Sequence, residues 1–269
     1  YEISACLVGS EMCIRDRALT GCIMQALTGN VMAEPYTLGI QSGAGMFAAF
    51  SIAFFSQIPI LGILGTNILA FIGAMVSMIF VYIISSRDKA KSNSNLILIG
   101  ISISMLCNAI IQLIIAFAPD NAKIRSIVFW TMGGLGGAHW EDISLLFIVS
   151  IIGFIITYAL AEELNIISMG EETAIILGVQ LRKLNKILLV CVSVMVGPIV
   201  SISGSIGFVG LITPHIVRKI VGSDHKKLIP VATLTGALFL VWTDIVSRVI
   251  VAPKELPIGV ICLLYTSPS

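Results

Sequence analysis

Charged residues are scarce in this sequence. Only 12% of its 269 residues are Asp, Glu, Lys or Arg, and 57% are hydrophobic. Soluble globular domains carry about 25% charged residues, so this chain cannot cover a globular surface with polar groups. The net charge of +1 provides no electrostatic attraction to nucleic acid. The composition excludes a soluble domain and indicates a protein embedded in a lipid bilayer.

Motifs of catalytic and metal-binding sites are also missing. The sequence contains no GxxxxGK(S/T) stretch, and therefore no P-loop for ATP, and it contains neither HExxH nor GxSxG. Its cysteines form no CxxC pair, so we expect small buried hydrophobic residues rather than metal ligands or disulfides. They are Cys6, Cys13, Cys22, Cys107, Cys191 and Cys262. We predict no catalytic residue, no metal site and no cofactor, and we do not expect this chain to be an enzyme.

What the sequence does contain is a series of apolar runs, each close to the ~20 residues that cross a bilayer as a helix. The runs are continuously apolar rather than alternating, which favours helices over barrel strands. We therefore predict an all-α, polytopic transmembrane helical bundle. The predicted spans are 18–33, 44–62, 63–84, 96–117, 143–161, 186–203, 206–221 and 229–250. The division near Pro59 stays open, because Gly62 or Gly65 could mark the turn.

Basic residues between the spans predict the orientation. The segments 85–95, 162–186 and 218–228 hold three, three and four Lys or Arg residues, and with these spans they fall on one side of the membrane. The opposite side holds four, which are Lys123, Arg125, Arg248 and Lys254. Since cytoplasmic loops are enriched in Lys and Arg, we place the first three segments in the cytoplasm.

The two ends of the chain differ from the rest. The strings SACLVGSEMCIRDR and LLYTSPS look like translated cloning sequence rather than native protein. We expect residues 1–17 and 264–269 to be non-native tails and residues 18–263 to form the transmembrane domain, cut inside a span at each end.

A short cytoplasmic helix is predicted at 168–179. Ser168 and Glu171 have the spacing of a capping box, Glu171 and Glu172 lie where the helix dipole favours acids, and Gly178 suits the C-terminal cap. A helix this short is marginal in water unless it docks on something. From these residues alone, insertion into a cytoplasmic partner and attachment to the lipid surface both remain open.

The stretch 201–215 is unusually rich in glycine for a span. Gly204, Gly207 and Gly210 occur within seven residues and are followed by Pro214, which we expect to kink its helix. Broken helices at membrane depth are tolerated where they line protein or a water-filled path. With Ser203, these residues are candidates for a translocation path; the alternative is close helix packing through small residues.

Two features are predicted on the outer side. The segment 118–142 is expected to be a flexible loop with tryptophans at the membrane interface. Asp244 lies within an apolar span and is by its position a functional candidate. Arg248 follows four residues later on the same helix face, so an ion pair is the simpler explanation.

Three stretches carry a resemblance to a known family. They are MQALTGNVMAEPYTLGIQSGAG at 24–45, LNIISMGEETAIILGV at 164–179, and the region 202–260, which contains SGSIGFVGLITPHIVRKIVGSDHKKLIP and DIVSRVIVAPKELPIGV. In this order they resemble the permease subunits of ABC importers for ferric siderophores, haem and cobalamin, over roughly residues 18–263. One departure is Val31, which stands where the family typically has proline.

The resemblance implies a multi-pass protein of the bacterial plasma (inner) membrane, whose members have ten spans, so that about eight are retained here. It implies a dimer with a second permease copy, two ATP-binding cassette subunits on the cytoplasmic face, and a substrate-binding lipoprotein or periplasmic protein on the outer face. The family's ATPase-coupling helix corresponds to Gly170, Glu171, Glu172, Thr173, Ala174, Leu177, Gly178 and Val179.

Further residues take roles from the same resemblance. Gln25 lies in the first matching stretch and joins the translocation-path candidates. The outer cations Lys123, Arg125, Arg248 and Lys254 become candidates for docking the binding protein, since charges at the rim of an interface guide association. The sequence does not name the cargo.

Two other function classes would need residues that the sequence barely offers. An ion-coupled secondary transporter would need intramembrane acids facing a cavity, and only Asp244 qualifies. A membrane enzyme would need a nucleophile or a metal set, and no such motif occurs.

Overall fold

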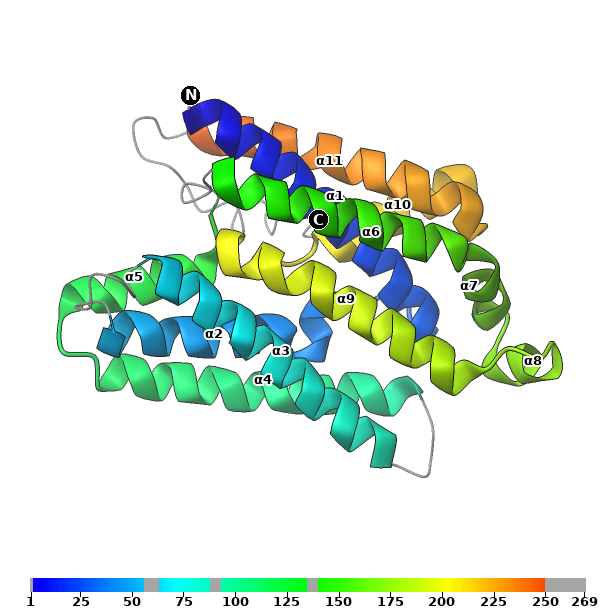
Figure 1. The fold of residues 1–269 in the computed structure, drawn as a ribbon, viewed down its shortest axis with the longest axis horizontal. Coiled ribbons are helices and arrows are strands. Elements are labelled where there is room, and N and C mark those ends of the chain that lie inside the picture. The colour runs from blue at the N-terminus through cyan, green and yellow to red at the C-terminus, as the bar shows by residue number, and fades with distance from the viewer. Residues whose placement is uncertain (1, 56–62, 88–92, 135–139, 250–269) are drawn as a thin grey trace.

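A computed structural model describes residues 2–55, 63–87, 93–134 and 140–249. All regular secondary structure within these ranges is helical, which confirms the all-α prediction (Figure 1). The elements are α1 (Glu2–Thr28), the 3₁₀ turn η1 (Pro35–Leu38), α2 (Ile40–Phe50), the π-helical η2 (Ser51–Phe55), α3 (Ile63–Arg87), α4 (Asn93–Ala116), α5 (Asn121–Met132), α6 (Trp140–Ala159), α7 (Ala161–Ser168), α8 (Glu171–Ile176), α9 (Leu181–Ser203), α10 (Val209–Val221) and α11 (His225–Val249).

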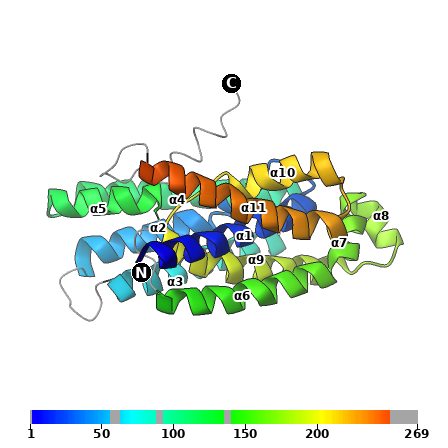
Figure 2. The same ribbon diagram turned by 90° about the horizontal axis from the view of Figure 1, so that it is seen from above.

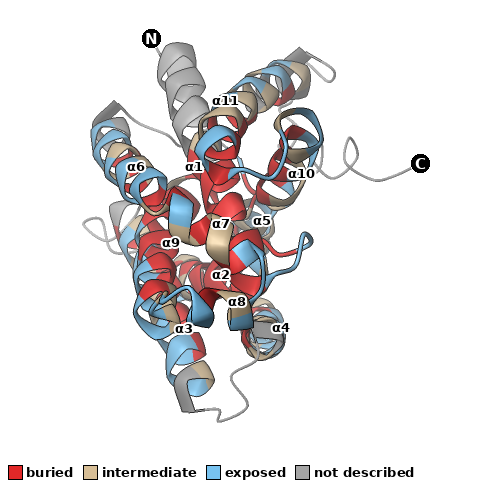
Figure 3. Ribbon diagram, turned by 90° about the vertical axis from the view of Figure 1, so that its right-hand side faces the viewer, coloured by how far each residue is buried: buried red, intermediate tan, exposed pale blue. Residues whose placement is uncertain are grey.

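Helix α1 is the centre of the bundle. It packs against α6 on one side and against α10 and α11 on the other, with α9 also in contact (Figure 2). Leu19, Ile23 and Leu27 are fully buried. Gly21 allows the closest approach, because a Cβ atom at this position would overlap the carbonyl of Gly210 in α10. The end view in Figure 3 shows buried residues on several helices, among them α1, α2 and α9.

The outer helices present apolar side chains to the surroundings. Leu98, Met105 and Leu106 of α4 are exposed, as are Ile148 and Ile155 of α6. Large apolar surfaces of this kind mark contact with lipid or with another protein. The pattern fits helices whose outer faces lie in hydrocarbon, as the composition predicts.

The described residues include four helices that are long and apolar enough to cross a membrane: α3, α4, α9 and α11. A fifth span results if α6 and α7, bent by 57° at Leu160, are counted together. The predicted span 206–221 is shorter than expected, because α10 has only 13 residues, about 20 Å against ~30 Å of hydrocarbon. The predicted span 44–62 is helical up to Phe55, and residues 56–62 lie outside the described ranges.

The three segments rich in Lys and Arg share one end of the bundle. The end of α3, the start of α4, the α6–α9 connection and the α10–α11 turn lie together at the right of Figure 1. The predicted common side of these segments is therefore confirmed. We call it the basic end.

Helix α1 runs through the predicted boundary at residue 17 without a break. Asp16 and Arg17 are buried; Ser150 donates a hydrogen bond to Asp16, and Arg17 donates to Ser203 and to the carbonyl of Ile206. The first tail is thus helical from Glu2 onward. Its non-native origin, like that of residues 264–269, stays a prediction.

Candidate functional site

At the basic end, the predicted short helix is present as α8, and a second short helix, α7, precedes it. The chain turns from α7 into α8 at Gly170, whose φ of 113° is accessible mainly to glycine. The predicted capping box is wrong. Ser168 is the last residue of α7, and its hydroxyl donates to the carbonyl of Leu164 at 2.8 Å, while the residue before α8 is Gly170, which has no side chain to offer.

The predicted helix-ending role of Gly178 is confirmed. Its φ is 83°, and its N–H donates to the carbonyl of Ile175 at 3.0 Å. The next N–H, of Val179, donates to the carbonyl of Ala174 at 3.0 Å. This pair of bonds is the Schellman arrangement that closes a helix on a left-handed glycine. The connection into α9 is therefore ordered by backbone bonds.

Helix α8 lies beyond the ends of the long helices in both Figure 1 and Figure 2. Ala174 is fully buried and anchors it. The opposite side exposes Met169, Ile175, Ile176 and Leu177, and Ile176 is 83% exposed. We call these four residues the α8 ridge. Such a cluster of exposed apolar side chains, with Glu171 and Glu172 beside it, is typical of a contact surface.

A second group of contacts joins α7 to the start of α11. Asn165 donates to the carboxylate of Asp224 at 2.9 Å and accepts the backbone N–H of His225 at 2.8 Å. Glu162 and Lys226 form an ion pair at 2.6 Å. The hydrogen bond from Asn165, followed by that from the Lys226 backbone, lowers the pKa of Asp224 below its ordinary value. We call these contacts the α7–α11 latch.

The glycine-rich stretch 201–215 contains a helix interruption, which lies before Pro214. Helix α9 ends at Ser203 and α10 begins at Val209, with Gly204 at φ 67° and Phe208 at φ 69° between them. Pro214 lies buried inside α10. The kink at Pro214 stays a prediction, while the end of α9 at Ser203 confirms the predicted end of the span 186–203. Gln25 of α1 donates to the carbonyl of Leu211 at 3.2 Å.

The start of α10 has a partner from a distant part of the chain. The carboxylate of Glu34, in the loop after α1, accepts the backbone N–H of Phe208 at 3.0 Å. The first N–H groups of a helix have no partner within it, and the positive end of the helix dipole favours an acid there. Glu34 is buried, so this contact holds the interrupted segment against the α1 loop.

All six translocation-path candidates lie on or beside the α9–α10 segment. Gly210 is pressed against α1, and Gly204 against the carbonyl of Trp130, where added Cβ atoms would be 2.9 Å and 2.5 Å from the nearest backbone oxygen. Close packing therefore accounts for these two glycines. Gly207 has more room, since its nearest neighbour would be Glu34 at 3.7 Å.

The outer candidates divide into two groups. Lys123 donates to the carbonyl of Ala53 at 2.8 Å and ties α5 to the end of η2, whereas Arg125 is exposed. The side chains of Arg248 and Asp244, and all of Lys254, lie outside the described residues. The predicted loop at 118–142 is partly wrong, because residues 121–132 form α5. The fully buried Ile127 anchors this helix against an apolar cluster with Ala49, Ala53, Ile111 and Ile114.

Cysteine and metal chemistry add nothing to this site in the part of the chain that the structure describes. Cys22, Cys107 and Cys191 are free and buried. No group of three His, Cys, Asp or Glu residues within the described ranges could hold a metal ion.

Comparison with known proteins identifies the family of this chain. The model of the FecCD transport family matches residues 3–269. The chain belongs to the FecCD transport family. The haemin transport system permease protein HmuU of Yersinia pestis is 36% identical over 256 residues, which cover 93% of this chain and 75% of the relative. The Fe(3+) dicitrate transport system permease protein FecC of Escherichia coli is 34% identical over 268 residues, or 99% and 78% of the two chains.

A solved structure agrees with this assignment. An inward-facing metal-chelate type ABC transporter superposes with a TM-score of 0.89 at 29% identity and covers 97% of this chain and 82% of its own. The resemblance seen in the three sequence stretches is thereby confirmed. The chain is a multi-pass permease subunit of an ABC transporter in the bacterial inner membrane and is not itself the ATPase. A permease of this kind works with a separate ATPase and a binding protein.

Proposed function

We propose that this FecCD-family permease imports a ferric-siderophore, haem or corrinoid-type ligand into the cytoplasm. Two of its relatives are named for haemin and for Fe(3+) dicitrate, which supports a metal-chelate cargo. The observation that carries the energy coupling is the α8 ridge, exposed at the basic end of the bundle. An ATP-driven mechanism requires a surface of this kind for the separate ATPase.

The coupling helix of the proposal is α8 with its flanking residues, Gly170 to Val179. The apolar α8 ridge would fill a cleft of the ATPase, and Glu171 and Glu172 would pair with basic residues at its rim. Ala174 and the Gly178 turn hold α8 on the bundle. A movement of the ATPase would therefore reach α7 and α9 directly, and would reach α11 through the α7–α11 latch.

The proposed assembly has two permease copies, two ATP-binding cassette subunits on the cytoplasmic face and a binding lipoprotein or periplasmic protein on the outer face. Each permease would have ten spans. Of the candidates for docking the binding protein, the structure describes the side chains of Lys123 and Arg125, and Arg125 is the exposed one. Lys123 is engaged with Ala53 and would act by holding α5 in place.

The proposed path follows the α9–α10 segment. Interrupted helices at membrane depth are tolerated where they line protein or a cavity, and residues 204–208 form such an interruption. Gly207 has the most room of the path glycines and lies beside Glu34 and Tyr36. Gln25 donates to the carbonyl of Leu211, and Ser203 accepts from Arg17, so both polar side chains link α1 to the helices that flank this interruption.

Charge reversal tests the coupling surface. The double variant Glu171→Lys, Glu172→Lys, and separately Ile176→Asp, are assembled with the cognate ATPase and binding protein in vesicles. We expect at least a tenfold loss of ATPase association and of ATP-driven uptake, about the effect of losing 1.4 kcal/mol of binding. The control Glu163→Lys reverses one acidic charge on α7, outside α8, and should retain both ATPase association and uptake.

Two results would contradict the proposal. Unchanged association and uptake in both α8 variants would remove α8 as the coupling surface. Uptake that persists without the ATPase and collapses when ionophores remove the ion gradients would instead support an ion-coupled secondary transporter.

A further inference from the structure

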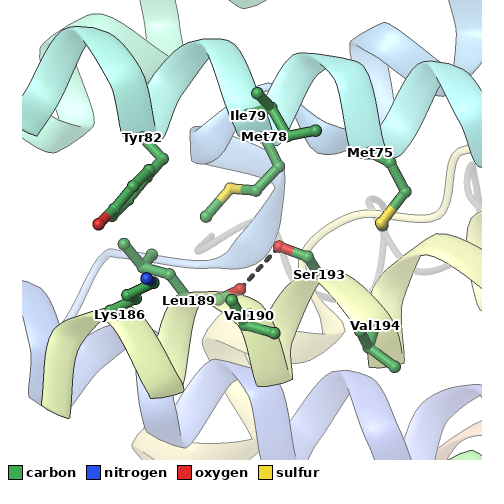
Figure 4. A pocket seen from close by; sticks show the side chains of 9 residues that line it. All are labelled: Met75, Met78, Ile79, Tyr82, Lys186, Leu189, Val190, Ser193 and Val194. Carbon is green, nitrogen blue, oxygen red and sulfur yellow. Dashed lines mark hydrogen bonds between the residues drawn. The ribbon is translucent and has the colours of Figure 1, made fainter. Parts of the chain in front are cut away.

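A groove of about 220 Å³ lies between α3 and α9, separate from the α8 ridge and from the α9–α10 break. Its lining residues are Met75, Met78, Ile79, Tyr82, Lys186, Leu189, Val190, Ser193 and Val194 (Figure 4). Ile79 and Val190 are each 55% exposed, so the groove opens outward from the bundle. An apolar cavity of about 150 Å³ already accommodates a benzene molecule, and this groove is larger.

The polar groups of the groove lie at one end. Figure 4 shows Tyr82 and Lys186 on opposite walls at the same end, with Met75 and Val194 at the other. Ser193 is the remaining polar lining residue, and its hydroxyl donates to the carbonyl of Leu189 within its own helix at 2.7 Å. The floor of the groove is therefore apolar, and its head is cationic and aromatic.

The length and position of the groove match one leaflet of a bilayer. Lys186 and Val194 are eight residues apart on α9, which is about 12 Å along the helix. Half of the hydrocarbon core is about 15 Å. Lys186 is close to the basic end, where Arg182 and Lys183 are also exposed. At the far end, Met75 and Phe71 lie against Gly197.

Charge decides between possible occupants. None of the described residues that line the groove is acidic, so a protein helix seated there would bury Lys186 without a partner from this chain. A second copy packed symmetrically on the same face would bring the two sets of Arg182, Lys183 and Lys186 together, and like charges across an interface are unfavourable. An anionic lipid matches the groove in both respects. Its acyl chain matches the apolar lining, and its negative head group matches the charge of Lys186.

We propose that the α3–α9 groove binds an acyl chain of an anionic phospholipid from the cytoplasmic leaflet, with its phosphate held by Lys186 and the hydroxyl of Tyr82. Aromatic and basic side chains at the membrane interface commonly hold lipid head groups. Bound there, the lipid fills the space between two spans that would otherwise lack contacts. The bound lipid would also support α9, which follows directly on α8 and would receive the movement of the ATPase from it. This last point rests on the proposed function.

Native mass spectrometry of the purified chain in mixed micelles tests the proposal. The probes are phosphatidylglycerol and the zwitterionic phosphatidylcholine, at equal concentrations. Lys186→Gln should weaken the binding of phosphatidylglycerol about fivefold, the effect of one basic residue near an anionic surface. The control Lys183→Gln removes a neighbouring cation that does not line the groove and should change binding less than twofold.

Filling the groove provides an independent test. Val190→Trp, or Ile79→Trp on the opposite wall, should displace the tightly bound phosphatidylglycerol, whereas Ile148→Trp on the exposed face of α6 should retain it. Circular dichroism and size-exclusion chromatography select the variants that fold, and the two groove positions provide alternatives if one fails.

Several results would overturn the lipid assignment. They are equal effects of Lys186→Gln and Lys183→Gln, equal binding of both phospholipids, or retention of phosphatidylglycerol in a folded groove-filled variant. A disulfide between two copies of Val190→Cys at this face would show a second permease there instead. None of these outcomes depends on transport, so the lipid site can fail while the proposed function stands.

Discussion

Asn165 of α7 and His225 of α11 are joined by one oxygen atom. The Oδ1 of Asn165 accepts the backbone N–H of His225 at 2.8 Å, and the ring Nδ1 of His225 lies 2.8 Å from the same atom. The amide nitrogen of Asn165 donates to Asp224 at 2.9 Å. A single side chain thus connects the segment that precedes α8 to the first turn of a long helix.

Asn165→Ala should uncouple ATP hydrolysis from transport. The substitution removes all of these contacts and leaves the backbone N–H of His225 without its acceptor, a loss of about 1–3 kcal/mol for a buried group. We expect the complex to keep its ATPase activity while the amount of ligand transported per ATP falls several-fold. The measurement is the ratio of uptake to phosphate release in vesicles.

Asn185→Ala provides the matched control for this experiment. Asn185 lies on α9 near the same end of the bundle and takes no part in the latch, so its ratio should equal that of the unmodified protein. An unchanged ratio in Asn165→Ala would show that the latch only supports the fold.

Glu34→Ala should destabilise the interrupted segment. It leaves the N–H of Phe208 unpaired at the start of α10, which costs about 1–3 kcal/mol, at a residue whose left-handed backbone already costs about 1–3 kcal/mol. Thermal unfolding in detergent should shift down by several degrees. Glu34→Gln keeps an acceptor oxygen and should have a smaller effect; equal shifts for the two variants would contradict the assigned contact.

Gly21→Ala should prevent the close packing of α1 on α10. The added methyl group would overlap the carbonyl of Gly210, and overpacking of a well-packed core costs about 1–3 kcal/mol or more. We expect a reduced monodisperse fraction on size-exclusion chromatography and a lower unfolding temperature. Gly134→Ala is the control, because nothing lies within 4 Å of its added Cβ. Normal behaviour of Gly21→Ala would mean that the two helices lie farther apart.

Arg125 and Lys123 should respond differently to charge reversal. Arg125 is exposed, so Arg125→Glu should slow association of the binding protein at low ionic strength, with little effect at high salt. Lys123→Glu removes the hydrogen bond to Ala53 and should lower thermal stability instead. Surface plasmon resonance at two salt concentrations and thermal unfolding separate the effects. The docking assignment fails for Arg125 if its association rate does not change.

Parts of the candidate site could be read from the chain alone. Gly178 was identified as the end of the coupling helix, because a glycine after a short helical stretch closes it with local backbone bonds. The capping-box prediction for Ser168 failed, because α7 extends through this residue and occupies its hydroxyl. The α7–α11 latch gave no sequence signal, since its partners Asn165 and Asp224 are 59 residues apart.

The sequence by itself determined the class of the protein and the common side of its basic segments. Both follow from composition and from local runs of residues. Apolar helices are stable in hydrocarbon, and Lys and Arg are enriched in the loops on the cytoplasmic side. Only the tertiary structure decided what holds the interruption between α9 and α10. The predicted span ends at 203 and 206 already lie at this interruption, but the acceptor for the N–H of Phe208 is Glu34, 174 residues away. Contacts between such distant segments are not encoded in any local pattern.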